Sequence, residues 1–483
     1  MLHLQLLLVK FGVRLVGVKL GILGLGIVGT GTVELLLDRV GRHPLLQEIE
    51  IYRVGVRSQG KPRAVRLPEG VITTDLDSIV TDPAVDIVVE VMGGLEPARS
   101  LILKAIAAGK HVVTANKAVI ARYSDEIFTL AEQVGVYIML EAAVGGGIPV
   151  IQPLRQSLSV NRIHTITGIV NGTTNYILTR MQTEGSHFSD VLADAQKLGY
   201  AEADPTTDVD GLDAADKIAI LASLANGCRI NLEDVYCEGI RQVSQTDITY
   251  AKKLGFVIKL LAIAKRETPL PLANFPLSPE GTPSPPLSVR VHPTLVPEAH
   301  PLASIHGVNN AILVEGEPIG QVMFFGPGAG AGATASAVTS DILNIVAAIK
   351  TAKVSTQKLD QSKIGISNQE RSNEPKSQMI LPNPLLSCRH QDYCQIALMA
   401  ELVTRFYARF LTKDQSGVIG KLGTCFGNHG VSLESVVQTG FQGKLAEIVV
   451  VTHDVREGDF RRALTEIGTL EAIDSIPSIL RVL

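Results

Sequence analysis

The stretch VKLGILGLGIVG at residues 18–29 decides how the first part of the chain folds. Val18–Leu23 is apolar enough for a buried strand, and a helical run follows the glycines. Between strand and helix lies a GxGxxG motif, formed by Gly24, Leu25, Gly26, Ile27, Val28 and Gly29. The first glycine permits a tight turn, the second lets the backbone approach a pyrophosphate, and the third lets helix and strand pack closely. Because free N–H groups at a helix start suit phosphates, the motif predicts a dinucleotide site rather than a glycine-rich packing turn.

Further short apolar runs follow at spacings that leave room for a helix between each pair. They occupy residues 52–56, 87–91, 111–114 and 136–140. Continuous apolar strands separated by helices are typical of a parallel sheet that is covered on both faces. The sequence therefore predicts an α/β fold, with a Rossmann-type doubly wound domain over residues 18–146 and an N-terminal extension at 1–17.

The rest of the chain divides by composition. Residues 147–325 are helix-rich at first and then contain strands, which predicts an α+β catalytic and dimerisation domain; seven prolines within 268–287 indicate an exposed insertion. Residues 326–351 are expected to return to the nucleotide domain, and the polar segment 352–402 to be a linker. The pattern over 403–483 predicts a ferredoxin-like βαββαβ unit.

The bulk composition excludes several classes of function. The 483-residue chain is 46% hydrophobic, which suffices for several cores, and its formal net charge is only −4. Because no basic stripe stands out, we expect neither nucleic-acid binding nor attachment to a membrane surface. We also expect no membrane span, since no run of about 18 uninterrupted apolar residues occurs.

The five cysteines are odd in number and follow no disulfide framework, so a reducing cytoplasm is the expected location. Cys388, His390 and Cys394 could supply ligands to zinc. Because no second Cys/His pair lies nearby, ordinary thiols in a linker are the favoured interpretation.

The end of the second predicted strand indicates which dinucleotide is bound. NAD sites usually carry an acidic residue there, which holds the ribose 2′-hydroxyl. This chain has no acid at that point and instead carries Arg57, Lys61 and Arg63. Cations suit a 2′-phosphate, so NADP(H) is the expected cofactor and NAD(H) the second option. The alternative is a solvated basic loop.

A second polar segment, from Thr114 to Lys117, follows the fourth predicted strand. The carboxyl ends of strands in such sheets line the ligand crevice. Lys117 could therefore touch the cofactor or a polarised oxygen, although an ordinary surface lysine would give the same pattern.

The segment AQKLGYAEADPTTDVDGLDAADK at residues 195–217 concentrates acidic side chains before a lysine. Asp213 and Lys217 are four residues apart, which places them on one face of a helix. A carboxylate can hold the amine and set its protonation state, and such a pair can donate a proton to an alkoxide as a hydride arrives. The alternative is an acidic helix start that only caps itself.

This segment resembles the signature of the homoserine dehydrogenases, in register throughout. The matching positions are Ala195, Gly199, Tyr200, Ala201, Asp204, Pro205, Asp208, Val209, Gly211, Asp213 and Lys217. The resemblance covers roughly residues 18–350 and includes the GxGxxG loop, Asn116-Lys117 and the segments 141–149, 172–177, 291–293, 326–330 and 334–338. The departures are the N-terminal extension and the proline-rich insertion, and neither touches a motif.

The resemblance implies reversible reduction of L-aspartate 4-semialdehyde to L-homoserine, in threonine, methionine and isoleucine biosynthesis. It implies Lys217 as the proton donor, with Asp213 beside it contacting the substrate, and Lys117 between nicotinamide and the reacting oxygen. Two lysines near a developing alkoxide make physical sense, because positive charge favours that transition state. The other implied contacts are Glu202 for the substrate ammonium, Asp208, Thr173 and Tyr200 for the rest of the substrate, and Thr114, Gly199 and Gly330 for the cofactor.

The loop after Glu141 resembles the monovalent-cation site of the same family. A hard cation needs several oxygen ligands, and a glycine-rich loop can turn its carbonyls inward. The resemblance implies that Glu141, Val144, Gly146 and Ile148 are the ligands and that Na⁺ is the ion. A tight structural turn is the alternative.

The C-terminal unit resembles an ACT domain, a module that binds small amino acids at paired interfaces. Residues 410–418 resemble its first strand and helix start, and residues 428–431 the turn into its second strand. Asp414 and Asn428 are the expected effector contacts, with threonine as the expected effector and a dimer or tetramer as the expected assembly. The alternative is a dimerising module without a ligand.

Two other functions compete with this one. A non-catalytic sensor, in which the nucleotide domain reports to the ACT module, has no need of a proton donor, so intact Glu202, Asp213 and Lys217 speak against it. A different ACT-linked dehydrogenase, acting on a hydroxy acid, would place its GxGxxG motif in mid-chain and rely on a catalytic histidine. In this chain the motif begins at Gly24 and the candidate catalytic residues are lysines, which disfavours that alternative.

Overall fold

A computed structural model describes residues 17–267, 285–362, 383–388 and 392–483. Most of the predicted N-terminal extension and proline-rich insertion, and the middle of the predicted linker, lie outside the described residues. The chain forms two compact units. The first contains Met1–Gln156 and Ala329–Arg389, and the second contains Ser157–Gly328 and His390–Leu483.

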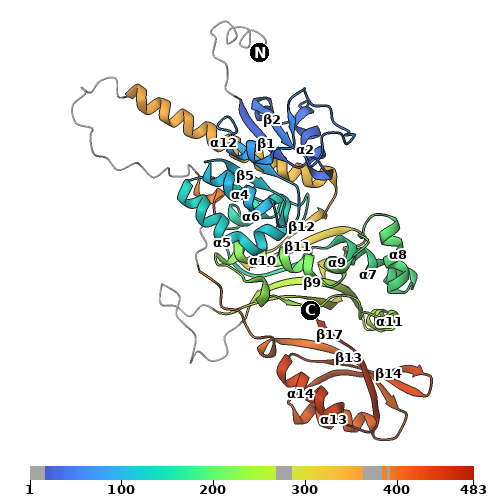
Figure 1. Ribbon diagram of the computed structural model, residues 1–483. Helices are drawn as coiled ribbons and strands as arrows, with labels where there is room; N and C mark the ends of the chain where they lie inside the picture. The colour runs from blue at the N-terminus through green and yellow to red at the C-terminus, as the bar shows by residue number, and fades with distance from the viewer. Residues whose placement is uncertain (1–16, 268–284, 363–382, 389–391) are drawn as a thin grey trace. The chain divides into compact units, whose positions relative to one another are not determined.

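The first unit contains a six-stranded sheet in which every neighbouring pair is parallel (Figure 1). Its strand order is β3-β2-β1-β4-β5-β6, which is that of the doubly wound dinucleotide-binding fold. The strands are β1 Val18–Leu23, β2 Ile49–Gly55, β3 Ile72–Thr73, β4 Ile87–Glu90, β5 His111–Thr114 and β6 Ile138–Met139. The predicted Rossmann-type sheet is confirmed, with the two-residue strand β3 added.

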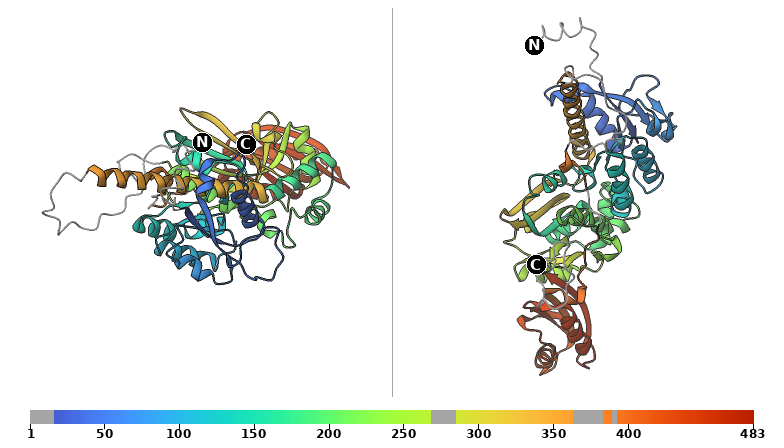
Figure 2. Two further views of the ribbon diagram at one scale, coloured as in Figure 1. Left: turned by 90° about the horizontal axis from the view of Figure 1, so that it is seen from above. Right: turned by 90° about the vertical axis from the view of Figure 1, so that its left-hand side faces the viewer.

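Helices lie between and after these strands in the sequence, and a long helix from later in the chain belongs to the same unit. They are α2 Ile27–Leu37, α3 Leu76–Thr81, α4 Ala98–Ala107, α5 Lys117–Val134, α6 Ile151–Arg155 and α12 Ala331–Ser362. Figure 2 shows α12 as one extended helix, which continues past residue 352, where the sequence predicts a linker. It packs so tightly on α2 that a β-carbon added to Gly31 would lie 2.9 Å from the carbonyl oxygen of Ala331.

Among the described residues, one helical segment is long and apolar enough to cross a membrane by length and composition alone. This segment, Ala331–Ala352 of α12, was not anticipated from the sequence. Its most apolar window is 56% buried, and Val338, Ile342 and Ile345 pack into the hydrophobic core of the first unit. Such burial is typical of a helix that completes a protein core.

The second unit contains a mixed sheet that begins with the strands of the predicted catalytic domain. These are β7 Arg162–Ile169, β8 Tyr236–Cys237, β9 Phe256–Arg266, β10 Leu287–Pro297, β11 Asn309–Glu317 and β12 Gly320–Pro327. The accompanying helices are α7 Gly172–Glu184, α8 Phe188–Lys197, α9 Thr206–Val209, α10 Leu212–Asn226 and α11 Gln245–Lys253. Strand β9 was missed from the sequence, where the region up to residue 267 looked helix-rich.

The C-terminal part of this unit has the predicted ferredoxin-like order. Its elements are β13 Val403–Lys413, α13 Val418–Asn428, β14 Leu433–Gln442, β15 Leu445–Thr452, α14 Glu457–Ile467 and β17 Ile473–Val482, with the short β16 at Val455–Arg456. Phe406, Phe410, Phe426 and Phe460 form the aromatic centre of its core.

The ferredoxin-like strands continue the catalytic sheet, so the two parts are not separate bodies. Strand β17 pairs in parallel with β10, and one sheet results, in the order β12-β11-β7-β9-β10-β17-β13-β15-β14. The guanidinium of Arg409 on β13 lies 2.8 Å from the Asp247 carboxylate on α11 and 3.2 Å from that of Glu447. The Tyr250 hydroxyl also bonds to Glu447. Because these charges are buried, removing the tail would leave Asp247 without its partner.

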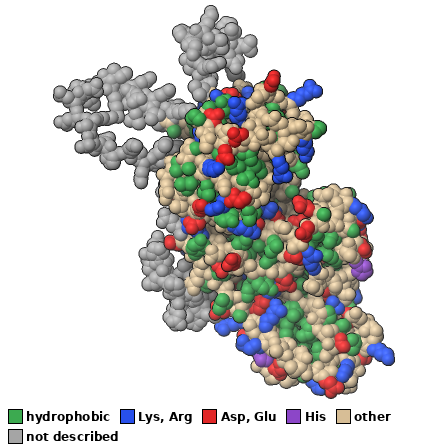
Figure 3. Space-filling model, in the orientation of Figure 1, with side chains coloured by type: hydrophobic (Ala, Val, Ile, Leu, Met, Phe, Trp, Pro, Cys, Tyr) green, Lys and Arg blue, Asp and Glu red, His purple; other side chains and the backbone are tan. Residues whose placement is uncertain are grey.

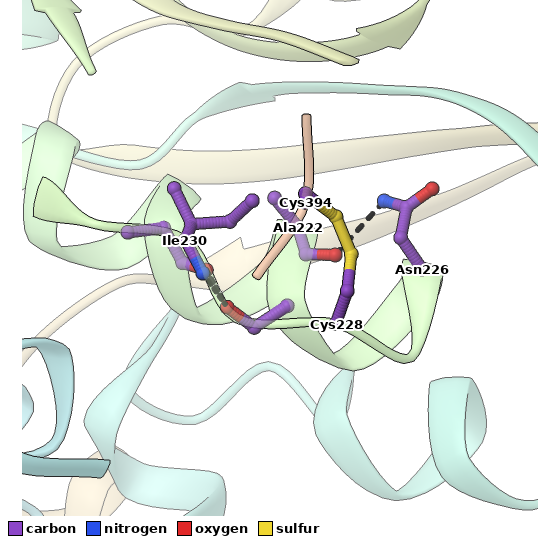
Figure 4. Close-up of a disulfide and its surroundings, with 7 residues drawn as sticks. Ala222, Asn226, Cys228, Ile230 and Cys394 are labelled. Atoms are coloured by element: carbon purple, nitrogen blue, oxygen red, sulfur yellow. Dashed lines mark hydrogen bonds between the residues drawn. A yellow bond between two sulfur atoms is a disulfide. The ribbon is translucent and has the colours of Figure 1, made fainter. Parts of the chain in front are cut away.

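A disulfide between Cys228 and Cys394 corrects the prediction of ordinary thiols for these two residues, whereas Cys237, Cys388 and Cys425 are free thiols (Figure 4). Cys228 follows Gly227, the residue that ends α10, and Cys394 lies in the segment that leads to β13. Backbone hydrogen bonds of 2.8 and 2.9 Å link Arg229 to the same segment. His390, one of the three candidate zinc ligands, lies outside the described residues, and among the described residues no group of three or more His, Cys, Asp or Glu side chains suited to a metal occurs.

Charged side chains of both signs are interspersed over the described part of the face that Figure 3 shows. This distribution agrees with the small net charge of the whole chain.

Candidate active site

The GxGxxG loop has the geometry that a dinucleotide needs. Gly24 has a φ of +106°, and a β-carbon there would lie 2.9 Å from the carbonyl oxygen of Val91. A β-carbon on Gly29 would collide with the carbonyl oxygen of Gly24, whereas one on Gly26 would meet nothing within 4 Å. Two glycines therefore satisfy packing, and the third keeps space open at the N-terminus of α2, where a pyrophosphate fits.

In the basic loop after β2, one cationic side chain forms hydrogen bonds within the loop and two are exposed to solvent. The Arg63 guanidinium donates to the carbonyl oxygens of Gln59 and Lys61, each at 2.9 Å, and to that of Ser58. Arg63 therefore holds the loop in shape, while Arg57 and Lys61 are exposed side chains at the end of the strand.

The end of β5 is tied to a buried carboxylate that sequence reasoning missed. The Thr114 hydroxyl donates to Glu90 at 2.7 Å and accepts from the backbone N–H of Asn116 at 3.0 Å. Asn116 in turn caps α5 and donates to the carbonyl oxygen of Gly94 at 2.7 Å. Burial raises the pKa of Glu90. This network fixes the backbone at Lys117, the first residue of α5.

The loop 141–150 combines a capping carboxylate with unpaired carbonyl groups. Glu141 accepts hydrogen bonds from the N–H groups at the start of α6, at 2.6–2.8 Å. Its own N–H donates to Asp341 of α12 at 2.7 Å, and burial, followed by the charge of Glu141, raises the pKa of Asp341 to about 8. No donor within the described parts of the chain reaches the carbonyl oxygens of Val144, Gly146 and Ile148, which are buried residues. These oxygens suit a hard cation.

In the second unit, the predicted proton donor is held between a helix and a strand end. The Lys217 ammonium lies 2.7 Å from Asp213 Oδ2, one turn earlier on α10, and 2.6 Å from the carbonyl oxygen of Val170, just after β7. The exposed fractions of the Lys217 and Asp213 side chains are only 12% and 7%. A lysine fixed in this way can transfer a proton to an oxygen placed beside it.

The carboxylates of Asp213 and Asp208 meet at one side chain that the sequence analysis did not single out. Asn171 Nδ2 donates to Asp213 Oδ2 at 2.9 Å and to Asp208 Oδ1 at 2.7 Å. The only sequence signal for it is a capping residue before the helix that starts at Gly172.

The remaining predicted substrate residues surround the start of α7. The Thr173 hydroxyl donates to the carbonyl oxygen of Tyr200 at 2.7 Å, and the Tyr200 ring packs edge-on against that of Tyr176. Gly199, with a φ of +75°, and Glu202 are exposed nearby in the same segment. No acceptor in the described part of the chain reaches the N–H groups of Gly172 and Thr173, so this helix start can receive an anion.

The predicted effector residues are not brought together in this chain. Asp414 lines a cavity of about 190 Å³ at the N-terminal end of α13, with Thr412, Lys413, Gln415 and Gln438 among its other lining residues. Asn428 ends α13 at its other end, where its amide donates to Glu466 at 3.3 Å.

The predicted residues thus form two groups within the two units. The glycine loop, Arg57, Lys61, Thr114, Lys117, Gly330 and the 141–148 loop belong to the first, and the substrate residues with Lys217 belong to the second. A dinucleotide-binding domain and a domain with a lysine–carboxylate centre together define a nicotinamide-dependent oxidoreductase of a small polar substrate.

Comparison with known proteins names the family. The family models described as homoserine dehydrogenase, its NAD-binding domain and the ACT domain match residues 149–343, 24–141 and 406–472. The chain belongs to the homoserine dehydrogenase family and is an NAD(P)-dependent oxidoreductase with an ACT domain.

Three relatives match nearly the full length of the chain, and a fourth matches about two thirds of it. A homoserine dehydrogenase of Synechocystis sp. is 62% identical over 96% of this chain and 99% of that protein, and one of Bacillus subtilis is 38% identical over 96% and 98%. A solved homoserine dehydrogenase from Thiobacillus denitrificans has a TM-score of 0.80 at 37% identity, covering 97% of this chain and 98% of its own. A hyperthermophilic archaeal homoserine dehydrogenase in complex with NADPH has a TM-score of 0.56 at 28% identity, covering 68% and 97%.

Proposed function

We propose that this chain catalyses the reversible NADP(H)-dependent reduction of L-aspartate 4-semialdehyde to L-homoserine, with Lys217 as the proton donor. The observation that carries the proposal is the part-buried Lys217 ammonium, held by Asp213 and by the carbonyl oxygen of Val170. When bound, NADPH would supply a hydride to the aldehyde carbon. Lys217 then gives its proton to the resulting alkoxide, while Lys117 adds positive charge next to the reacting oxygen.

The other charged groups of the substrate can be bound by groups of opposite charge or polarity. Glu202 is exposed and can receive the substrate ammonium, and Asp208 and Asp213 add negative charge on the same side of α7. The N–H groups at Gly172 and Thr173, which lie beside Tyr200, suit the substrate carboxylate. Gly199 and Gly330, where the backbone carries no side chain, leave room for the cofactor, and Thr114 lies at a strand end that faces the ligand crevice.

The cofactor preference is argued from charge. Arg57 and Lys61 are exposed at the end of β2, and no carboxylate stands at the position that would hold a ribose 2′-hydroxyl. The similarity to a protein solved with NADPH supports the same preference.

We propose feedback inhibition by threonine, which the ACT domain and the implied pathway both support. Threonine is an end product of the route that begins with this substrate, and the cavity beside Asp414 is large enough for a small amino acid. We propose a homo-oligomer, a dimer or tetramer, since ACT domains bind effectors at paired interfaces. We also propose a cytoplasmic location, which suits a biosynthetic enzyme and no longer rests on the cysteine pattern, because Cys228 and Cys394 are paired. Light scattering that gives a monomer mass at micromolar concentration would contradict the assembly.

Replacing Lys217 with alanine should reduce kcat by roughly 10²–10⁴-fold, because general acid catalysis contributes about that factor. The dissociation constant for NADPH, measured by cofactor fluorescence, should change little. Lys252→Ala, which removes an exposed lysine from α11, is the matched control. If the Lys217 variant keeps more than about a tenth of kcat, another group donates the proton.

Replacing Arg57 and Lys61 with glutamine should raise KM for NADPH far more than KM for NADH. Each charge-assisted hydrogen bond to the 2′-phosphate contributes on the order of 1.5–3 kcal/mol, and NADH lacks that phosphate. Arg42→Gln, at an exposed arginine paired with Asp38 beyond the end of α2, is the control. Equal effects on both cofactors would overturn the assignment.

Na⁺ should raise the melting temperature, because an ion that binds only the folded state stabilises it. We propose Glu141 and the carbonyl oxygens of Val144, Gly146 and Ile148 as its site. Scanning calorimetry in NaCl and in N-methylglucamine chloride at equal ionic strength makes the comparison. Identical melting temperatures and identical kcat in both salts would show that the loop is only a structural turn.

Threonine should inhibit the full-length enzyme, and Asp414→Ala should weaken that inhibition by about 5–150-fold, the usual range of allosteric coupling. Point variants are preferable to truncation of the ACT domain, because truncation would remove β17, which pairs with β10 of the catalytic sheet. Asp454→Ala, at an exposed position of the same domain, is the control, and Asn428→Ala tests the far end of α13. Inhibition that survives in Asp414→Ala would place the effector elsewhere, and no response to threonine, methionine or isoleucine would exclude amino-acid sensing.

A further inference from the structure

Asn171 lies where three parts of the substrate-binding region meet. It follows β7 and caps α7, and its side chain is buried, with 5% exposed. Its amide nitrogen reaches Asp208 of α9 and Asp213 of α10. The residue before it, Val170, supplies the carbonyl oxygen that accepts from Lys217. Two consecutive residues therefore fix both members of the Asp213–Lys217 pair.

The hydrogen bonds of Asn171 leave its amide a single orientation. Its Oδ1 accepts from the backbone N–H of Thr174 at 2.8 Å and from the Thr174 hydroxyl at 3.0 Å. Its Nδ2 is therefore directed away from the helix and donates one hydrogen to each carboxylate. A flipped amide would bring its oxygen against two carboxylates and its NH₂ group against a backbone N–H, and would lose all of these bonds.

No other capping residue can perform both tasks. Serine and aspartate cap helices as well as asparagine does, because each offers an oxygen to the N–H groups of the first turn. Neither carries a two-hydrogen amide that can bridge two carboxylates. Aspartate, which has the same shape as asparagine, would instead add a third negative group beside Asp208 and Asp213.

We propose that Asn171 is a positioning residue for proton transfer, which holds Asp213 in register with Lys217 and keeps Asp208 beside it by bridging the two carboxylates. The inference rests on the roles proposed above for Lys217 and Asp213. Without the bridge, Asp213 loses the Asn171 hydrogen bond to its Oδ2 and moves relative to the lysine. A displacement of about 1 Å near a reacting group can reduce the rate on the order of a hundredfold.

The test compares Asn171→Ser and Asn171→Asp by kcat and by the primary isotope effect on kcat with NADPH deuterated at the transferred position. We expect kcat to fall at least about tenfold in the serine variant and further in the aspartate variant, with an increased isotope effect because the chemical step becomes slower. A residue that only caps α7 predicts the opposite ranking, since aspartate keeps both the cap and the shape.

Controls separate positioning from folding. Circular dichroism and NADPH binding should match the unaltered enzyme in at least one of the two variants, and Asp75→Ser, an exchange of cap at α3 in the first unit, should leave kcat unchanged. If both Asn171 variants keep kcat and isotope effect, or if the aspartate variant is the more active, the positioning role is wrong. Lys217→Ala in the same assays distinguishes the two failures, because a fully active Lys217 variant would overturn the proposed function itself.

Discussion

The candidate catalytic centre of the second unit depends on one largely buried ion pair, that of Asp213 and Lys217. Removing two charges from water is costly, and their attraction compensates only when further hydrogen bonds satisfy both groups. Here the Val170 carbonyl oxygen also accepts a hydrogen bond from the lysine, and the Asn171 amide donates one to the aspartate. The pair therefore requires the end of β7 and the start of α10 to converge. Gly211 makes that convergence possible, because it starts α10 with a φ of +84° close against Cys237 and β10.

The candidate cofactor site of the first unit depends on close packing at glycines, whereas the candidate catalytic centre of the second unit depends on charge. Gly24 and Gly29 have no space for a side chain, so strand, turn and helix approach more closely than other residues would allow. Gly31 repeats this arrangement between α2 and the start of α12. The consequence is functional, because the close packing holds the N-terminus of α2 fixed while Gly26 leaves the space in front of it open.

The sequence is most informative where a few neighbouring residues determine the outcome. The GxGxxG loop, the Asp213–Lys217 spacing and the βαββαβ order are all local patterns, and the structure has each of them. Strand β9 was missed because a long apolar run fits a buried helix as well as a buried strand. The Cys228–Cys394 disulfide joins residues 166 positions apart, a pairing that no spacing rule predicts. Asn171 was missed because its importance lies in partners from two other helices.

The junction between the catalytic and ACT strands places a cavity and a buried charge network on opposite faces of one strand. Ala446 and Ile448 of β15 line the cavity beside Asp414, whereas Glu447, between them, points to the opposite face and contacts Arg409. Side chains alternate along a strand, so these three residues face the cavity on one side of β15 and Arg409 and Tyr250 on the other. Arg409 then meets Asp247 of α11, a helix that packs on β9 and α7. An effector bound in that cavity would therefore have a continuous sheet and a buried charge network through which to act on the catalytic strands.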